Sequence, residues 1–264
     1  DEWYAKDGST LVTASTSNLT EAQKALTNGC GLTYDEYKTA YQKMLKSVYT
    51  YGGFWIGRYE AGIEGSIEDV SKARTSHTTI TIGTSPKAIS QKDAIPYNYV
   101  YCSEAQVLAK EMTPDNNYTS SLMFGIQWDL VCKYLEVKST LTTENINSDS
   151  STWGNYIDAE LTITSDKAKQ KGTPWTAITG KKAANSKILL TTGASEKTNK
   201  MNIYDFVGNE FEWTLEKTSY SNGPCALRGG NCNYTGSSDP ASCRNGDSMT
   251  NSDSGIGFRC ALYK

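Results

Sequence analysis

Helical patterning stops near the middle of this chain, and that limits the folds open to it more than any other feature. Three segments, at about 33–51, 103–112 and 123–135, place apolar residues at helical spacing. Beyond about residue 160 the sequence changes to short β-prone runs separated by long polar stretches. No internal repeat is visible. With 264 residues, 38% of them hydrophobic, the chain is long enough for one sizeable core, and the pattern predicts a single α+β domain.

The first helix has the clearest predicted boundaries. Thr33 and Glu36 form a capping box, and Gly52-Gly53 supplies the stop. Residues 1–32 are polar and turn-rich, so we expect an irregular lead-in before a domain over 33–264. The face predicted to pack inward carries Tyr37, Tyr41, Met44, Leu45 and Val48.

The remaining elements are expected to be short. Ser103 and Gln106 are predicted to cap the second helix. The third helix is predicted to turn Trp128, Val131 and Leu135 inward, and residues 138–152, rich in Ser, Thr and Asn, are predicted to form a loop. Strands are expected at 54–60, 78–82, 188–190 and 226–228.

Charge and hydropathy exclude several classes of partner. A net charge of −3 and a pI near 5.4 give no overall attraction to nucleic acid or anionic lipid. No apolar run approaches the roughly 20 residues that would cross a bilayer. Asp1-Glu2-Trp3 has the character of a processed start, and we expect any anchoring segment to lie outside this chain.

The cysteines leave the redox state open. None of them forms a C-x-x-C pair, and with His77 as the single histidine a zinc site is not expected. We expect His77, in a polar stretch, to be an exposed residue without a catalytic role. An odd number of cysteines leaves at least one thiol free or bridging two chains, and one or two disulfides are expected in an exported protein. The seven are Cys30, Cys102, Cys132, Cys225, Cys232, Cys243 and Cys260.

Seven motifs follow one another from residue 54 to the C-terminus. They are Phe54–Glu60, Tyr101–Ala105, Gln127–Asp129, Trp153–Asn155, Ile203–Thr214, Leu227–Asn231 and Gly257–Ala261. In this order they resemble the formylglycine-generating-enzyme/sulfatase-modifying family. The resemblance implies a C-type-lectin-like fold of the α+β class, with sparse regular secondary structure and long loops.

Several residues in these motifs suit a structural role. Gly208 fits a tight turn, Gly229 and Gly230 allow close approach of the backbone, and Trp213 is expected beneath the loops. Arg259 is expected to hold a carboxylate or carbonyls with its fork of donors.

The resemblance also implies bonds and ligands. It implies a disulfide between Cys102 and Cys260. The family's partner for Cys132 falls on Ala241 here, so Cys132 is expected to be unpaired. Glu212 is a candidate calcium ligand together with backbone carbonyls, because hard cations prefer oxygen, with a structural hydrogen-bonding role as the alternative.

The catalytic cysteines of the family have no counterparts in register. In the catalytic relatives two cysteines follow the Arg-Gly-Gly strand. Counted from Gly229-Gly230 these places fall on Tyr234 and Asp239, and counted back from Arg244 they fall on Asn231 and Gly236. Relatives of the ergothioneine type need three histidines for iron. We therefore predict a protein that is not an enzyme and has no cofactor, calcium excepted.

Residues 231–255 have the most biased composition in the chain. Of these 25 residues, 21 are Asn, Ser, Asp, Gly, Thr, Tyr or Cys. The segment resembles the C-terminal variable region of proteins mutated by diversity-generating retroelements, in which changes at template adenines scatter Asn codons into this set. Met249 departs from that pattern, because an AAC codon changed at its adenines cannot give Met. A polar surface loop is the plainer interpretation.

The resemblance to such variable proteins assigns roles along the segment. Asn231, Arg244, Phe258 and Arg259 are expected to hold the frame. The predicted recognition surface comprises Cys232, Tyr234, Ser238, Asp239, Cys243, Gly246, Asp247, Met249, Ser252, Asp253, Ser254 and Gly255.

These observations lead to one expected function and two alternatives. We expect a binding protein displayed outside the cell, on a bacterial surface or a phage virion, whose ligand is a protein or glycan on another cell. The first alternative is a divergent oxidoreductase that uses a metal bound by Cys232 or Cys243. The second is a structural virion or pilus subunit whose C-terminal loops only pack against neighbours.

Overall fold

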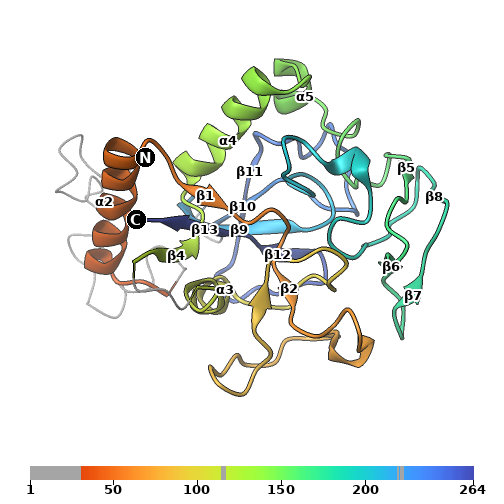
Figure 1. Ribbon diagram of the computed structural model, residues 1–264, viewed down its shortest axis with the longest axis horizontal. Helices are drawn as coiled ribbons and strands as arrows, with labels where there is room; N and C mark the ends of the chain where they lie inside the picture. Colours follow the sequence, from red (N-terminus) through yellow and green to blue (C-terminus); the bar gives the residue numbers. More distant parts are fainter. Residues whose placement is uncertain (1–30, 114–116, 219, 221–222) are drawn as a thin grey trace.

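The computed structural model describes residues 31–113, 117–218, 220 and 223–264 (Figure 1). Most of the predicted lead-in, with Cys30, lies outside these residues. The helices are α2 (Tyr34–Tyr51), α3 (Cys102–Lys110), α4 (Gly125–Lys138) and α5 (Thr143–Asn147), with 3-10 turns at Val70–Lys72 and Glu196–Thr198. The strands are β1 (Trp55–Ile56), β2 (Gly62–Ile63), β3 (Ala88–Ile89), β4 (Thr119–Leu122), β5 (Leu161–Thr162), β6 (Lys169–Gln170), β7 (Thr176–Ala177), β8 (Lys181–Lys182), β9 (Phe211–Lys217), β10 (Cys225–Arg228), β11 (Arg244–Asp247), β12 (Ile256–Phe258) and β13 (Cys260–Tyr263).

Two sheets organise the domain. One has the order β11-β10-β9-β12, in which β12 runs parallel to β9 and the other pairs are antiparallel. The other has the order β1-β13-β4 and is antiparallel throughout. Three two-stranded sheets, β2-β3, β5-β8 and β6-β7, complete the structure. The predicted α+β class with short elements is confirmed.

The first helix forms as its sequence predicts. The Thr33 hydroxyl accepts from Glu36 N, the Glu36 carboxylate accepts from Thr33 N, and Gly52 ends the helix with a φ of 82°. Tyr37 and Met44 are buried. Leu45 was wrongly placed on the inward face, because 45% of its surface is exposed.

The next two helices form where the sequence predicts them, with ends shifted by one to three residues and a different N-cap in α3. The N-cap of α3 is Tyr101, whose N–H donates to Glu104, whereas Gln106 is buried and accepts from Leu122 N of β4. The predicted cap at Ser103 and Gln106 is therefore wrong by two residues. In α4 the predicted inward residues are buried as expected, Trp128 and Leu135 completely.

Of the four predicted strands and the one predicted loop, only the strand at 226–228 is fully present. The strand predicted at 226–228 is present as part of β10, but only two residues of 54–60 pair in β1. No strand forms at 78–82 or 188–190, both described by the structure; Leu190 makes one isolated bridge with Gln170. The predicted loop at 138–152 contains α5.

The core gathers under the β9 sheet. Trp213 and Phe258 are fully buried in the main cluster, and Trp128 stacks on Phe206 in a second cluster with ring centroids 4.0 Å apart. In Figure 1, α2 lies at one end of the molecule and β5 to β8 lie at the other. Among the described residues, no helix is both long and apolar enough to cross a membrane.

Candidate recognition surface

Residues 231–255 begin at a sharply constrained backbone. Gly229 and Gly230 have φ values of +85° and +72°, and a Cβ on Gly230 would lie 2.7 Å from Asp239 O. Tyr156 reaches across from another loop, and its hydroxyl contacts the carbonyls of both Gly229 and Asp239 at 2.7 and 2.8 Å. The predicted close approach at these glycines is confirmed, and it sets the direction in which the segment leaves β10.

The two ends of the segment are tied together. Asn231 Nδ2 donates to Gly255 O at 3.0 Å, and Phe211 N of β9 donates to the same carbonyl at 2.8 Å. Between these ends the chain forms β11, which pairs with β10, and then a second loop that leads into β12. Residues 231–255 are therefore two loops joined by an edge strand on a fixed base.

Nine of the twelve predicted surface residues reach solvent. Tyr234, Ser238 and Asp253 are exposed, and the half-buried members are Cys243, Gly246, Asp247, Met249, Ser252 and Ser254. Tyr234 is 50% exposed, while its ring packs 5.8 Å from that of Phe211. It therefore offers an aromatic surface held rigidly from below.

Three predicted surface residues are buried, which corrects their assignment. Cys232 is 2% exposed and belongs to the main core. Asp239 is 6% exposed and accepts from Asn245 Nδ2 at 3.0 Å, so its carboxylate shapes the loop from inside. Gly255 is buried, and its carbonyl accepts hydrogen bonds from Asn231 and Phe211.

Four exposed polar residues of the same segment were not singled out by the sequence: Ser237, Arg244, Asn245 and Thr250. Arg244 had been assigned to the frame only.

Arg244 does hold the frame, through an ion cluster. It pairs with Asp129 of α4 and, through Nε at 2.7 Å, with Glu216 of β9. Both carboxylates also pair with Arg228 of β10, at 2.6 and 3.2 Å, and Arg228 is fully buried. Four charges thus join β11, β10, β9 and α4 beneath the segment.

A second buried charge cluster holds the base of the surface. Arg259 donates to both carboxylate oxygens of Glu212 and to the carbonyls of Gly57, Tyr204 and Asp205, at 2.8 to 3.2 Å. The predicted pinning role of Arg259 is confirmed. Burial raises the pKa of Glu212 to about 7 although Arg259 opposes the shift.

The Glu212 carboxylate makes the hydrogen bonds expected of a structural role, and its role as a calcium ligand stays a prediction. Both of its oxygens are engaged by Arg259, and the side chain is buried. Within the described residues, no group of three or more His, Cys, Asp or Glu side chains is arranged to hold a metal ion.

Neither nearby thiol has the environment of a reactive cysteine. Burial raises the pKa of Cys232 to about 12, and burial with the adjacent Asp239 carboxylate raises the pKa of Cys243. The thiolate is the form that attacks electrophiles and binds soft metals, so both groups are poorly prepared for either task at neutral pH. The Cys243 sulfur lies 3.7 Å from Asp239 Oδ1.

The implied disulfide is not formed in the structure. Cys260 is a thiol on β13, and the Cys102 sulfur faces the Thr214 carbonyl at 3.9 Å. Ala241, the position at which the family's partner of Cys132 would fall, does lie beside Cys132: the Cys132 sulfur is 3.9 Å from Ala241 O.

His77 is more engaged than its polar stretch indicates. Its ring stacks on Tyr101 with centroids 3.8 Å apart, and Nε2 lies 3.0 Å from Glu104. The expectation that His77 is exposed is therefore wrong, because its ring is partly buried by these contacts. These contacts join the 70–87 loop to the start of α3.

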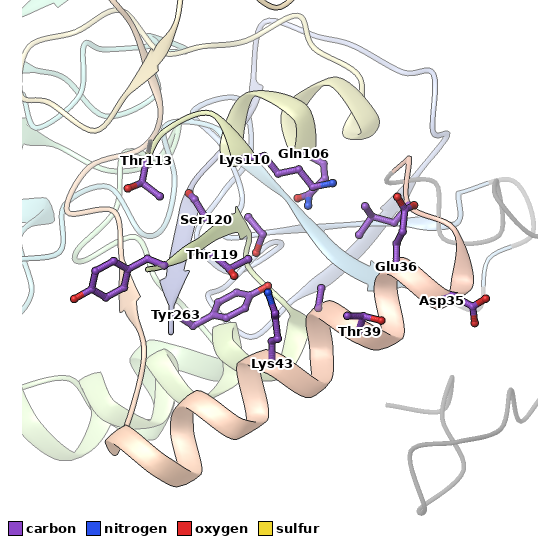
Figure 2. Close-up of a pocket in the computed structure, with 14 residues that line it drawn as sticks. Asp35, Glu36, Thr39, Lys43, Gln106, Lys110, Thr113, Thr119, Ser120 and Tyr263 are labelled. Carbon is purple, nitrogen blue, oxygen red and sulfur yellow. The ribbon is translucent and has the colours of Figure 1, made fainter. Parts of the chain in front are cut away.

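A groove of about 610 Å³ lies elsewhere, between α2 on one side and α3 and β4 on the other (Figure 2). Glu36, Thr39 and Lys43 of α2 face Thr119 and Ser120 of β4 across it. It contains none of the predicted site residues, and sequence reasoning gave no signal for it.

Comparisons with known proteins identify a family for this domain. The family model described as the sulfatase-modifying factor enzyme 1-like domain matches residues 34–264. Among solved structures, Treponema denticola variable protein 1 is similar with a TM-score of 0.44 and 13% identity, over 80% of this chain and 84% of that one. A crystal structure of CarF is similar with a TM-score of 0.35 and 14% identity, over 58% of this chain and 50% of that one. At these TM-scores neither structure gives a residue-level correspondence. No curated protein matches the chain.

Proposed function

Because the chain belongs to the family of sulfatase-modifying factor enzyme 1-like domains, we propose that it uses this fold as a rigid frame for binding and carries out no catalysis. The observation behind the proposal is the construction of residues 231–255. Their ends are fixed by the Asn231–Gly255 bond and the two glycines, while nine predicted positions between them reach solvent. Binding residues concentrate on loops that a rigid scaffold positions.

The side chains on this surface suit recognition of varied ligands. Small polar residues provide adaptable hydrogen bonding, and an occasional Tyr provides a large contact at low entropic cost, as in antibody loops. Tyr234, held by Phe211, is the aromatic contact of this kind. Met249 packs against the main core, which supports a positioning role for the residue that fits the variable pattern least.

The environments of the thiols support a non-enzymatic role. Copper-dependent chemistry in the family depends on thiolates in register, and here Cys232 is in the core while Cys243 lies beside a carboxylate. We expect Cys232→Ser/Cys243→Ser to leave metal content unchanged and wild type to oxidise no peptide thiol. Copper-dependent oxidation that the double variant lacks would establish the enzyme instead.

The proposal includes diversification of this surface, with a protein or glycan on another cell as the ligand and display on a bacterial surface or phage virion. The test is deep sequencing of the 3′ end of the gene across a population grown from one clone. We expect changes confined to codons 231–255, at sites derived from adenines and concentrated at the exposed positions. Changes spread along the gene, or none at all, would contradict diversification and leave a fixed binding module.

A further inference from the structure

Residues 161–200 form a lobe with its own small core and an unbalanced charge. Strands β5 to β8 lie in this lobe, at the end of the molecule opposite α2 (Figure 1). Leu161, Ile163, Ala168, Leu190 and Ala194 form its core. We call residues 161–200 the basic lobe.

The basic lobe has an excess of positive charge over negative charge. It holds eight lysines and two carboxylates, a formal charge of +6. The whole chain has 26 basic and 29 acidic residues, which leaves 18 basic and 27 acidic residues, or −9, for the remainder. The overall charge of −3 conceals this separation.

Few of these lysines are neutralised by the fold. Lys181 pairs with Glu160 at 2.7 Å, and Glu196 lies 3.8 Å from Lys92, which is outside the lobe. The structure describes every residue from 161 to 200, and these two are the ion pairs in which they take part. Other lysines donate to carbonyls, as Lys169 does to Ile67 O at 2.9 Å, and such bonds leave the charge in place. Lys167, Lys171 and Lys187 are exposed.

The surface between the lysines is hydrophilic. None of the exposed large hydrophobic residues of the described chain lies within 161–200. Exposed positions there include Thr173, Thr176, Thr179 and Asn185. Tight protein–protein contacts depend on buried aromatic or aliphatic anchors, which this surface lacks. Charge with hydroxyl and amide groups is suited to a hydrated polyanion.

The basic lobe adjoins the recognition surface at Lys171. The Lys171 ammonium lies 5.6 Å from the ring centroid of Tyr99. Tyr99 holds a φ of 53°, and its N–H donates to Asp253 O at 3.1 Å. Such a backbone persists in a non-glycine residue only where its surroundings fix it, so Tyr99 is a rigid link between lobe and segment.

We propose that the basic lobe binds an anionic polysaccharide, one that carries carboxylate, sulfate or phosphate groups along its chain. The polysaccharide would give attachment through charge, while residues 231–255 would add selectivity beside it. The inference does not depend on whether 231–255 varies.

The test compares two triple variants with equal changes in charge. Lys167→Gln/Lys171→Gln/Lys187→Gln neutralises the lobe, and Lys43→Gln/Lys46→Gln/Lys138→Gln removes three exposed lysines from α2 and α4. Immobilised heparin is the probe, with neutral dextran and single-stranded DNA as comparisons. We expect wild type to bind heparin but not dextran, less strongly at about 0.3 M salt because screening shortens the reach of the charges.

The lobe variant should lose heparin affinity by on the order of tenfold, whereas the control variant should stay near wild type. The triple Lys→Arg variant of the lobe should retain binding, which separates charge from folding. No heparin binding, equal losses in both Gln variants, or DNA bound as tightly as heparin would overturn the proposal. None of these results affects the sequencing test, so the two proposals fail separately.

Discussion

At the residue scale, Arg259 is the most connected buried side chain at the base of the recognition surface. We expect Arg259→Met to lower the free energy of unfolding by about 3–5 kcal/mol, because it leaves Glu212 buried without its cation. Urea denaturation measures the loss. Adding Glu212→Leu should recover part of it, since the double variant no longer buries a lone carboxylate. Exposed Arg58→Met is the matched control, expected to change the value by less than about 0.5 kcal/mol; equal losses at 58 and 259 would contradict the argument.

Residues fixed by backbone geometry were predictable from sequence, and residues in polar loops were not. Gly208 has a φ of 71°, and its Cβ would meet the Asn155 backbone at 2.5 Å, a requirement that only glycine satisfies. Trp213 is buried as expected. Cys232 and Asp239, in contrast, were assigned to the surface by the resemblance to variable proteins. Loops lack periodicity, so nothing in the sequence distinguishes a side chain that supports the loop from one that faces solvent.

At the element scale, the β11 edge strand depends on one ion cluster for its attachment to α4. We expect Arg244→Gln to cost at most about 1 kcal/mol in global stability, because the side chain is half exposed. Amide exchange in β11 should nevertheless become faster, since local opening no longer breaks contacts with Asp129 and Glu216. Hydrogen exchange read by mass spectrometry tests this. Lys133→Gln, which removes an exposed pair with Glu136, should leave β11 unchanged; equal exchange in all three proteins would contradict the tether.

Helices were predicted better than strands because helix signals are local. Thr33 and Gly52 bound α2 through contacts within a few residues. A strand ends where pairing with its neighbouring strand stops, and that neighbour is often distant in the sequence, so local sequence does not indicate the end. Gly57 N still donates to Cys260 O and Ala61 N to Phe258 O, but the chain between them turns away from the sheet. In the stretch predicted as a strand at 78–82, Ile80 N instead donates to Glu104.

At the scale of the whole molecule, net charge was a poor guide to electrostatics. A negative net charge excludes attraction to polyanions only if positive and negative residues are evenly distributed over the surface. Here residues 161–200 carry a formal charge of +6. Acidic side chains are also gathered, but inside the protein. Glu60, Asp205, Glu210 and Glu212 are all buried, with Arg259 as the guanidinium among them. Outside this cluster, the positive charge of Lys171 lowers the pKa of Glu210 and the negative charge of Asp253 raises it.

This buried acid cluster should make the protein more stable at mildly acidic pH. Burial raises the pKa of Glu60 and of Glu210 well above the usual value and that of Glu212 to about 7. The folded state therefore holds protons that the unfolded state releases above about pH 4.3, so stability falls as pH rises through the folded pKa values. From pH 5 to 7.5 we expect a loss on the order of 3 kcal/mol. Lys182, whose pKa burial lowers to about 8, acts in the opposite direction only at higher pH.

Urea midpoints at pH 5 and 7.5 measure this dependence, and Glu210→Gln isolates its source. The Glu210 carboxyl group is buried with the Asn98 side chain as a polar neighbour, so an uncharged amide of similar shape should cost little at pH 5. At pH 7.5 the variant should be more stable than wild type, because it no longer has to keep a proton or bury a charge. Exposed Glu144→Gln should follow wild type at both values. A wild-type midpoint that rises with pH would show that the cluster does not hold its protons, and a Glu210→Gln slope equal to that of wild type would show that Glu210 is not the source of the pH dependence.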